Sequence, residues 1–338
     1  MSTQFKVAAV QAAPCFLDLD AGIDKAIGLI EEAAKNGAHL IAFSETWLPG
    51  YPNHIWLGPV AWQMQFVGRY FDNSIEAGSE QEARLAKACR DNNIQLSMGC
   101  SERAGGSLYI AQWHFDETGE VVNRRRKLKP THVERTVYGE GDGSDLNVVQ
   151  TKIGRVGQLA CWEHLQPLSK YAMYAQDEQI HIAAWPNLHL YKDMAYALGP
   201  QVNNGASMLY AVEGSCFVVA PCSLVTKEIQ DMLCDGNKDM EAMLPVGGGH
   251  TRIFAPDGSE LAEHIPHDHE GIMYADINLH MIGYAKNAAD PAGHYAKRDS
   301  TRLLINRNKQ SAVVNFDDAS GLEEVVEQRS AAIETAAE

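Results

Sequence analysis

The chain has 338 residues with 44 acidic and 28 basic side chains, and its formal net charge is −16. This acidic balance argues against nucleic-acid binding through a broad basic face. Hydrophobic residues make up 45% and charged residues 21%, which is typical of a globular protein with a large core and excludes a disordered or fibrous chain.

In the first half of the chain, alternating and helical patterns predict five strands and two helices. The strands are predicted at 6–12, 39–44, 94–101, 109–116 and 120–128. The first helix has its apolar stripe at Ile23, Ile27, Ile30 and Ala34 and closes at Gly37. Ser79 and Glu82 have the spacing of a capping box, which predicts a second helix running toward Asn92.

The second half predicts further strands at 155–160, 180–185, 216–220 and 271–277, and a hairpin at 251–261 that turns on Asp257 and Gly258. Helices are predicted from Pro167, where proline suits a first turn, and over 199–212. No internal repeat or linker divides the chain. These strands are more than one open sheet comfortably holds, so the expected fold is α/β with two sheets covered by helices.

The domain is expected to span residues 1–305, since the strand pattern ends near Asn306. Residues 306–338 form an acidic tail that we expect to be flexible or involved in assembly.

The cysteines and the N-terminus indicate the compartment. Seven cysteines form no Cys-x-x-Cys pair, and an odd number cannot all pair within one chain, so a reducing cytoplasm is expected. The first 17 residues lack a basic stretch ahead of an apolar run, which argues against a signal peptide. The longest uncharged stretch, 46–68, contains three prolines and is not expected to cross a membrane.

Several cofactor and metal motifs can be set aside. There is no phosphate-binding P-loop, and the glycines at 139–143 and 247–249 do not fit a dinucleotide fingerprint. His264, His267 and His269 lie in a polar stretch without a cysteine partner and predict a surface loop rather than a zinc site. None of these segments therefore predicts a cofactor or a metal site.

Three features at predicted strand ends suggest chemistry: Glu45, the basic run 124–129 and Cys161. A thiol becomes a good nucleophile when a nearby cation or base favours the thiolate, and a carboxylate with a lysine would provide both. Taken singly, each feature has an ordinary alternative. Cys161 would be packed core, Glu45 a helix cap, and the arginine run a solvated face.

Three longer blocks favour the functional interpretation. FSETWLPGYP (43–52), RKLKPTHVER (126–135) with GEGDGS (139–144), and GQLACWEHLQPL (157–168) closely resemble the glutamate, lysine and cysteine blocks of nitrilases in the carbon–nitrogen hydrolase superfamily. Their order also resembles the family, with the three key residues 82 and 34 positions apart (127 − 45 and 161 − 127). The resemblance runs from about residue 6 to 297.

This resemblance implies a four-layer αββα sandwich and a Glu45–Lys127–Cys161 triad, with Glu134 as a second glutamate that orients the site. Lys127 is chosen over Lys129 because it matches the Arg-Lys start of the block. A strand pattern alone indicates only that the two lysines share a face. The implied reaction converts a nitrile to a carboxylic acid and ammonia through a covalent cysteine thioimidate and thioester.

Alternatives stay open at this point. An amidase or carbamoylase, or a cyanide-hydrating enzyme of the same superfamily, would use the same triad. A catalytically silent scaffold is disfavoured because all three triad residues are present.

Residues 161–186 are similar to bacterial arylacetonitrilases, so the expected substrate is a small nitrile one carbon removed from an aromatic ring. Candidate substrate-binding residues are Tyr51, His54, His132, Trp162 and Trp185, with Trp56 as a further aromatic candidate. The resemblance also implies a homodimer that builds a larger spiral homo-oligomer, without nucleic-acid or membrane partners.

Overall fold

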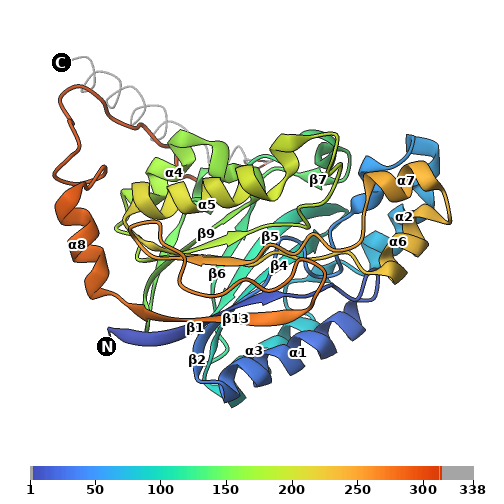
Figure 1. Cartoon of the computed structure of the whole chain (residues 1–338), viewed down its shortest axis with the longest axis horizontal. Coiled ribbons are helices and arrows are strands. Elements are labelled where there is room, and N and C mark those ends of the chain that lie inside the picture. The colour runs from blue at the N-terminus through green and yellow to red at the C-terminus, as the bar shows by residue number, and fades with distance from the viewer. Residues whose placement is uncertain (1–2, 312, 314–338) are drawn as a thin grey trace.

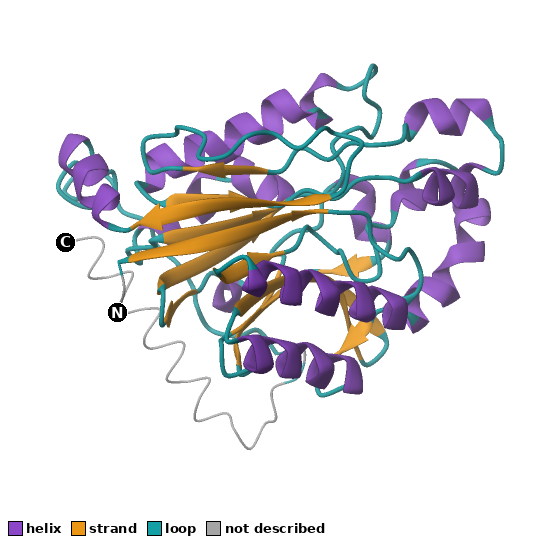
Figure 2. Ribbon diagram, turned by 60° about the horizontal axis from the view of Figure 1, so that its bottom comes forward, coloured by secondary structure: helices purple, strands orange, loops and turns teal. Residues whose placement is uncertain are grey.

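The computed structural model describes residues 3–311 and residue 313. Two β-sheets lie face to face, and helices cover the outer face of each (Figures 1 and 2). The predicted two-sheet architecture is confirmed, and its four layers follow from which side chains each sheet buries on its two faces.

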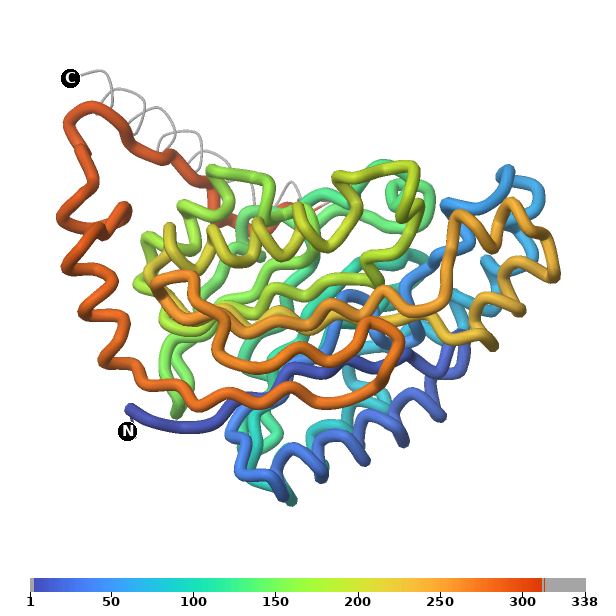
Figure 3. The backbone as a smooth tube through the Cα atoms, viewed as in Figure 1, coloured from blue at the N-terminus to red at the C-terminus, as the bar shows by residue number. Residues whose placement is uncertain are grey.

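The larger sheet has the order β13-β1-β2-β4-β5-β6, with β3 beside β4 and β7 beside β5. Its strands are β1 (Gln4–Gln11), β2 (Ala38–Ala42), β3 (Ile75–Glu76), β4 (Gln95–Ala104), β5 (Ser107–Phe115), β6 (Val121–Arg126), β7 (Tyr138–Gly139) and β13 (Gly271–Asn278). β1 and β13 come from opposite ends of the described chain and pair antiparallel, as the blue and orange tubes of Figure 3 show.

The smaller sheet has the order β12-β11-β10-β9-β8. Its strands are β8 (Val148–Thr151), β9 (Gly154–Ala160), β10 (Ile180–Ala184), β11 (Phe217–Ala220) and β12 (Arg252–Phe254). β9, β10 and β11 are parallel. Their carboxyl ends therefore meet at one edge of the sheet, where α/β proteins form their sites.

Helices α1 (Leu19–Lys35) and α3 (Glu80–Asn92) cover the larger sheet, and α4 (Pro167–Tyr174) and α5 (Pro200–Gly214) cover the smaller one (Figure 1). Helices α2 (Val60–Asp72), α6 (Lys227–Cys234) and α7 (Lys238–Met243) gather at one end, and α8 (His280–Ala288) follows β13. Short 3-10 turns are η1 (Asn53–Trp56), η2 (His132–Thr136), η3 (Gly143–Asp145), η4 (Cys161–Leu165) and η5 (Tyr196–Leu198).

Alternation along β1 shows how the layers form. Val7 and Ala9 pack between the sheets in one cluster with Ile182 of β10, whereas Ala8 and Val10 pack toward α1. A strand with both faces covered must be apolar at consecutive positions, which is why this segment reads as a nearly continuous apolar run. Burial of each large aliphatic side chain in these clusters contributes about 1.5–3 kcal/mol to folding.

The predicted strands and helices are found, with ends shifted by a few residues. The 251–261 hairpin is shorter than predicted, because its second arm pairs with β12 only through the Phe254–Glu260 bridge. The Ser79 hydroxyl accepts a hydrogen bond from the Glu82 N–H, as the capping pattern predicts. Helices α2, α6, α7 and α8 and strands β3, β7 and β8 were not predicted. Helix α2 buries only Phe66 and Tyr70, so it has too narrow an apolar stripe to stand out in the sequence.

No helix in the described part of the chain is long and apolar enough to cross a membrane. The first tail residues lie against the body, where Arg307 donates to the Leu146 carbonyl oxygen and the Gln310 N–H to Asp142. Residues 312 and 314–338 lie outside the described residues, so the acidic tail and the domain boundary at 305 stay predictions.

Candidate active site

Three strand ends bring the predicted triad together. Glu45 follows β2, Lys127 follows β6, and Cys161 follows β9, so the site draws on both sheets. The chain bearing Glu45 passes close to β4, where a Cβ on Gly99 would lie 1.9 Å from the Ser44 carbonyl oxygen. Glycine at this position is therefore what lets the Glu45 loop approach the sheet.

The Lys127 ammonium is held between two carboxylates. Its Nζ lies 2.8 Å from Glu45 Oε1 and 2.9 Å from Glu134 Oε2, and all three side chains are buried. Glu134 also accepts hydrogen bonds from the Tyr51 hydroxyl at 2.7 Å and the Thr131 N–H at 2.6 Å. Glu134 is thus fixed by three donors, and it fixes the lysine in turn.

Glu45 has one oxygen committed and one free. Oε1 accepts from Lys127, whereas Oε2 is buried and has no hydrogen-bond partner among the described residues. Burial raises the pKa of Glu45 to about 7, an effect that Lys127 opposes and Glu134 reinforces. A carboxyl group with a pKa near neutrality and a free oxygen is suited to moving protons at pH 7.

Lys127 stays charged in this environment. Burial alone would lower its pKa, but Glu134, Glu45 and Cys161 together raise that pKa well above its ordinary value. The lysine is therefore a permanent cation, available to stabilise negative charge that develops beside it.

Cys161 lies at the start of η4 with φ +50°, a left-handed conformation that costs a non-glycine residue about 1–3 kcal/mol. Burial raises the pKa of its thiol well above the ordinary value, and Glu45 raises it further. Lys127 and a hydrogen bond from the Trp162 N–H act in the opposite direction. The resting thiol is therefore protonated and needs a base to become a nucleophile.

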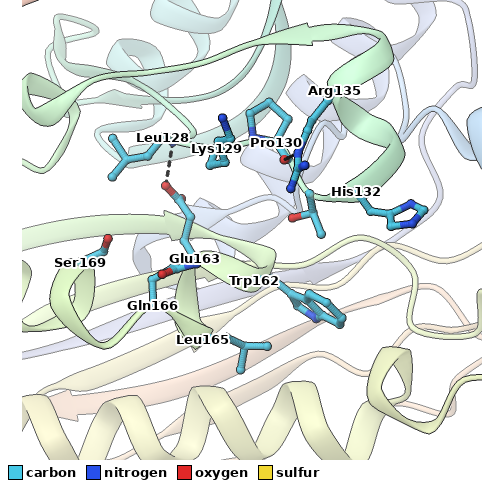
Figure 4. A pocket seen from close by; sticks show the side chains of 11 residues that line it. Leu128, Lys129, Pro130, His132, Arg135, Trp162, Glu163, Leu165, Gln166 and Ser169 are labelled. Carbon is cyan, nitrogen blue, oxygen red and sulfur yellow. Dashed lines mark hydrogen bonds between the residues drawn. The ribbon is translucent and has the colours of Figure 1, made fainter.

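Two residues of the site were not predicted as functional. Arg125, fully buried, makes a bidentate ion pair with Glu163 at 2.7 and 2.9 Å. Glu163 also accepts from the Leu128 N–H at 2.9 Å, drawn in Figure 4, and from the Ala160 N–H at 2.8 Å. One carboxylate thus ties the residue after Lys127 to the residue before Cys161.

The buried arginine argues against the alternative that the whole basic run is a solvated face. Along β6 the side chains of Asn123 and Arg125 are buried while Arg124 is exposed. The two-residue alternation of a strand could have revealed this.

Lys129 is mostly exposed and pairs with Glu140, away from the triad. The expectation that Lys127 and Lys129 share a face is therefore wrong, because β6 ends at Arg126 and strand alternation stops there. Of the two lysines, Lys127 is the one that lies beside Glu45.

A cavity opens beside Cys161 and Glu134. Tyr51, Trp162 and Trp185 line it, as predicted, together with residues that the sequence did not single out: Thr131, Pro186, Asn187, Leu188, Leu190, Leu198 and Asn203. Trp56, the further aromatic candidate, lines it as well. The indole N–H groups of Trp162 and Trp185 are engaged by Asn203 and Ser207. Both rings therefore offer apolar surface to the cavity.

The other two substrate-binding candidates do not line this cavity. His54 packs against Phe66 and Tyr70 and borders a separate depression. His132 stacks on Trp56 and borders an outer groove, which Figure 4 shows with Lys129, Arg135 and Trp162. Trp162 and Thr131 belong to both the cavity and this groove.

The predicted surface histidines are part of a loop. His264 pairs with Glu260, His269 pairs with Asp268, and His267 packs against His189. Among the described residues no group of three His, Cys, Asp or Glu side chains is placed to hold a metal ion. All seven cysteines are free thiols.

Known proteins share both the sequence and the fold. The chain is 54% identical over 318 residues to a nitrilase of Pseudomonas syringae, covering 94% of each chain. It is 50% identical to an arylacetone-specific nitrilase of Alcaligenes faecalis, covering 94% of this chain and 89% of that one. It is 49% identical to an aliphatic nitrilase of Rhodococcus rhodochrous, with 91% and 81% covered.

Among solved structures, a carbon–nitrogen hydrolase from Helicobacter pylori superposes with a TM-score of 0.70 at 19% identity, covering 88% of this chain and 96% of that one. The sequence profile of carbon–nitrogen hydrolases matches residues 6–287. The chain therefore belongs to the carbon–nitrogen hydrolase family.

Proposed function

We propose that this protein is a nitrilase, which hydrolyses an organic nitrile to the carboxylic acid and ammonia. The observation that carries the proposal is the Lys127 ammonium bound by Glu45 and Glu134 beside a buried cysteine in a strained conformation. Relatives named nitrilases, about half identical over most of the chain, support nitriles as the substrate class.

In the first half of the reaction Glu45 takes the Cys161 proton, and Sγ attacks the nitrile carbon. One carbon–nitrogen bonding pair moves onto nitrogen, which receives the proton from Glu45 to give a thioimidate. Lys127 and the Trp162 N–H stabilise the negative charge that develops on nitrogen.

In the second half Glu45 removes a proton from a water molecule that adds to the thioimidate carbon. Protonated nitrogen leaves as ammonia, and a thioester remains on Cys161. A second water, activated in the same way, releases the carboxylic acid and restores the thiol. Two waters are consumed for each nitrile, and Glu45 acts alternately as base and acid.

The substrate is proposed to be an arylacetonitrile. Aromatic and aliphatic side chains line the cavity beside Cys161, and the two tryptophan N–H groups already have partners, so the walls favour an apolar ring. The relative named as an arylacetone-specific nitrilase supports this choice. The relative named as an aliphatic nitrilase has nearly equal identity and supports an aliphatic nitrile as the competing substrate.

An ammonia-release panel tests both levels of the proposal. Phenylacetonitrile and mandelonitrile are expected to give higher kcat/KM than benzonitrile, an aliphatic dinitrile, cyanide or the matching amides. A preference for the amides would indicate an amidase or carbamoylase, and a preference for cyanide a cyanide-hydrating enzyme. Preference for the dinitrile would refute the aryl specificity alone.

We also propose that the protein acts in the cytoplasm and assembles as homodimers into a spiral homo-oligomer. Seven free thiols support a reducing compartment. Exposed apolar side chains on η4, α4 and α5 support self-association: Leu165, Leu168, Met208, Leu209 and Val212. Light scattering of the purified chain measures the assembly.

A further inference from the structure

A chain of hydrogen bonds runs through the layer between the smaller sheet and α5 and ends at the candidate nucleophile. The Tyr210 hydroxyl lies 2.6 Å from Glu178 Oε2, and Glu178 Oε1 lies 2.7 Å from His181 Nδ1. His181 Nε2 lies 2.9 Å from His164 Nε2. His164 Nδ1 lies 2.7 Å from the carbonyl oxygen of Cys161.

This series of hydrogen bonds is shielded from solvent, since its four side chains are at most 1% exposed. Glycine at position 157 in β9 makes room for the Glu178 carboxyl group, since a Cβ there would lie 1.9 Å from Glu178 Oε1. The mechanism proposed above uses none of these four groups.

The acceptors in this chain determine where its protons lie. A carbonyl oxygen only accepts, so His164 Nδ1 carries a hydrogen. Burial lowers the pKa of His164 to about 3, so the ring is neutral and its Nε2 is bare. His181 Nε2 must then be the donor to His164.

The same reasoning assigns the last proton. Burial lowers the pKa of His181 well below its ordinary value, so its Nδ1 is bare. Burial raises the pKa of Glu178 to about 8, so at pH 7 its carboxyl group is protonated and donates to His181. The contact is therefore a neutral hydrogen bond rather than an ion pair, and every donor in the chain points toward Cys161.

The last hydrogen bond of this series orients a peptide group that takes part in the reaction. In a trans peptide the C=O and the following N–H point in opposite directions in one plane. Holding the Cys161 carbonyl toward His164 therefore turns the Trp162 N–H to the other side, where it hydrogen-bonds the Cys161 thiol. The same N–H is the backbone donor for the charge that develops on the substrate.

We propose that Glu178, His181 and His164 are positioning residues that orient the Cys161–Trp162 peptide group, so that its N–H serves as an oxyanion-hole donor. The inference rests on the proposed nitrilase function and deepens it. It assigns the backbone donor a dedicated support outside the triad, and it gives His164 of the Cys-Trp-Glu-His segment a role in the chemical step.

Two substitutions of His164 separate the effect of its hydrogen bond to the Cys161 carbonyl oxygen from the effect of losing the imidazole ring. In His164→Asn the side-chain amide can take the place of Nδ1 and still donate to the Cys161 carbonyl oxygen, whereas in His164→Gln it takes the place of Nε2 and leaves that oxygen unbound. We expect kcat to fall about 10- to 100-fold in His164→Gln and to stay within about fivefold in His164→Asn, with KM little changed in both.

A second pair tests the far end and does not alter His164. In Glu178→Gln the amide can donate to His181 Nδ1 and accept from Tyr210, as the protonated carboxyl group does. Glu178→Leu can do neither. The Gln variant is expected to keep kcat within about threefold, and the Leu variant to lose about tenfold.

Alkylation of Cys161 by iodoacetamide provides the control, because it consumes the thiol without forming an oxyanion. Mass spectrometry of the peptide 156–170 follows it. Because the Trp162 N–H also lowers the pKa of the Cys161 thiol, alkylation is expected to slow in His164→Gln and Glu178→Leu, but by a smaller factor than kcat per alkylatable Cys161. Equal losses of kcat and alkylation, or equal kcat within both pairs, would overturn the proposal.

Failure of the proposed function is distinguishable from failure of this inference. Absence of ammonia release from any nitrile by the unaltered protein would refute the nitrilase assignment. The same variant pairs would then be compared on an amide that the protein hydrolyses, because an amide carbonyl develops its charge against the same N–H.

Discussion

Replacing Lys127 by Met is expected to remove activity almost completely while leaving a folded protein. The Lys127 Nζ is the only cation that the structure places within 4.0 Å of either Glu45 or Glu134 in its described part, at 2.8 and 2.9 Å. Loss of one donor to the developing charge typically costs about 10²- to 10³-fold in kcat, or about 2.7–4 kcal/mol of transition-state stabilisation.

A second loss adds to the first. Lys127 lowers the pKa of Glu45 both through its charge and through a hydrogen bond, so without it that pKa rises above about 7. Each further pKa unit makes the base about tenfold scarcer at pH 7, so the total expected loss is about 10³- to 10⁴-fold. Part of that factor should return at higher pH.

Stability should fall by less than activity. Removing one partner from a buried ion pair costs about 3–5 kcal/mol when a charge is left behind, but Glu45 can take up a proton and avoid much of that cost. Thermal unfolding followed by circular dichroism should therefore show a lower Tm and a native spectrum.

Lys129→Met is the matched control, since it makes the same change two residues away. Lys129 and Glu140 are both more than half exposed. Such a pair contributes about 0–1 kcal/mol to stability, and kcat should stay within about threefold. Ammonia release from phenylacetonitrile measures both variants. If Lys129→Met lost more activity than Lys127→Met, the assignment of the catalytic lysine would be wrong.

Three further predictions concern pH dependence and the buried ion pair. Because Glu45 must be deprotonated to act as base and burial raises its pKa to about 7, kcat/KM should fall about tenfold per unit below pH 7, and a profile flat down to pH 5 would contradict this role. Glu178 makes the stability of the fold depend on pH. Its folded pKa of about 8 lies above its ordinary value, so its contribution to stability is complete below about pH 4.5 and is lost as pH rises through about 8. In Glu178→Gln the urea midpoint should therefore depend less on pH between pH 6 and 9. Glu163→Gln leaves Arg125 without its anionic partner and should cost about 3–5 kcal/mol in urea unfolding. Adding Arg125→Met should restore much of the stability but not kcat, because Leu128 and Ala160 still lack the carboxylate. Recovery of kcat in the double variant would show that Glu163 acts on stability alone.

The strands around the site could be predicted because each carries its own pattern. β2 and β9 are buried on both faces, so they read as short apolar runs that end in Glu45 and Cys161. The identity of the lysine came from the resemblance of a block, since strand alternation fails once the chain leaves β6 after Arg126.

The residues that support the site could not be predicted from the sequence, for a different reason. Glu178 and His181 are polar residues in a segment that otherwise reads as core, and nothing local indicates that they contact His164. Asn203 and Leu198 reach the cavity from α5 and η5, about 40 residues after Cys161, through tertiary packing alone. His54 was predicted to bind substrate, but in η1 its side chain packs against Phe66 instead of lining the cavity.

The central claim is that the reaction passes through a covalent bond to Cys161. Mass spectrometry of the Glu45→Gln variant, quenched in acid after incubation with phenylacetonitrile and digested with trypsin, tests this directly. In this variant the thiolate fraction that Lys127 sustains still attacks slowly, whereas no base remains to activate the waters that clear the adduct. We therefore expect a thioimidate or acyl adduct on the peptide 156–170, which contains Cys161 as its one cysteine, and no adduct when Cys161→Ala is added. An adduct on Cys15 or any other cysteine, or nitrile turnover that persists in Cys161→Ala, would contradict it.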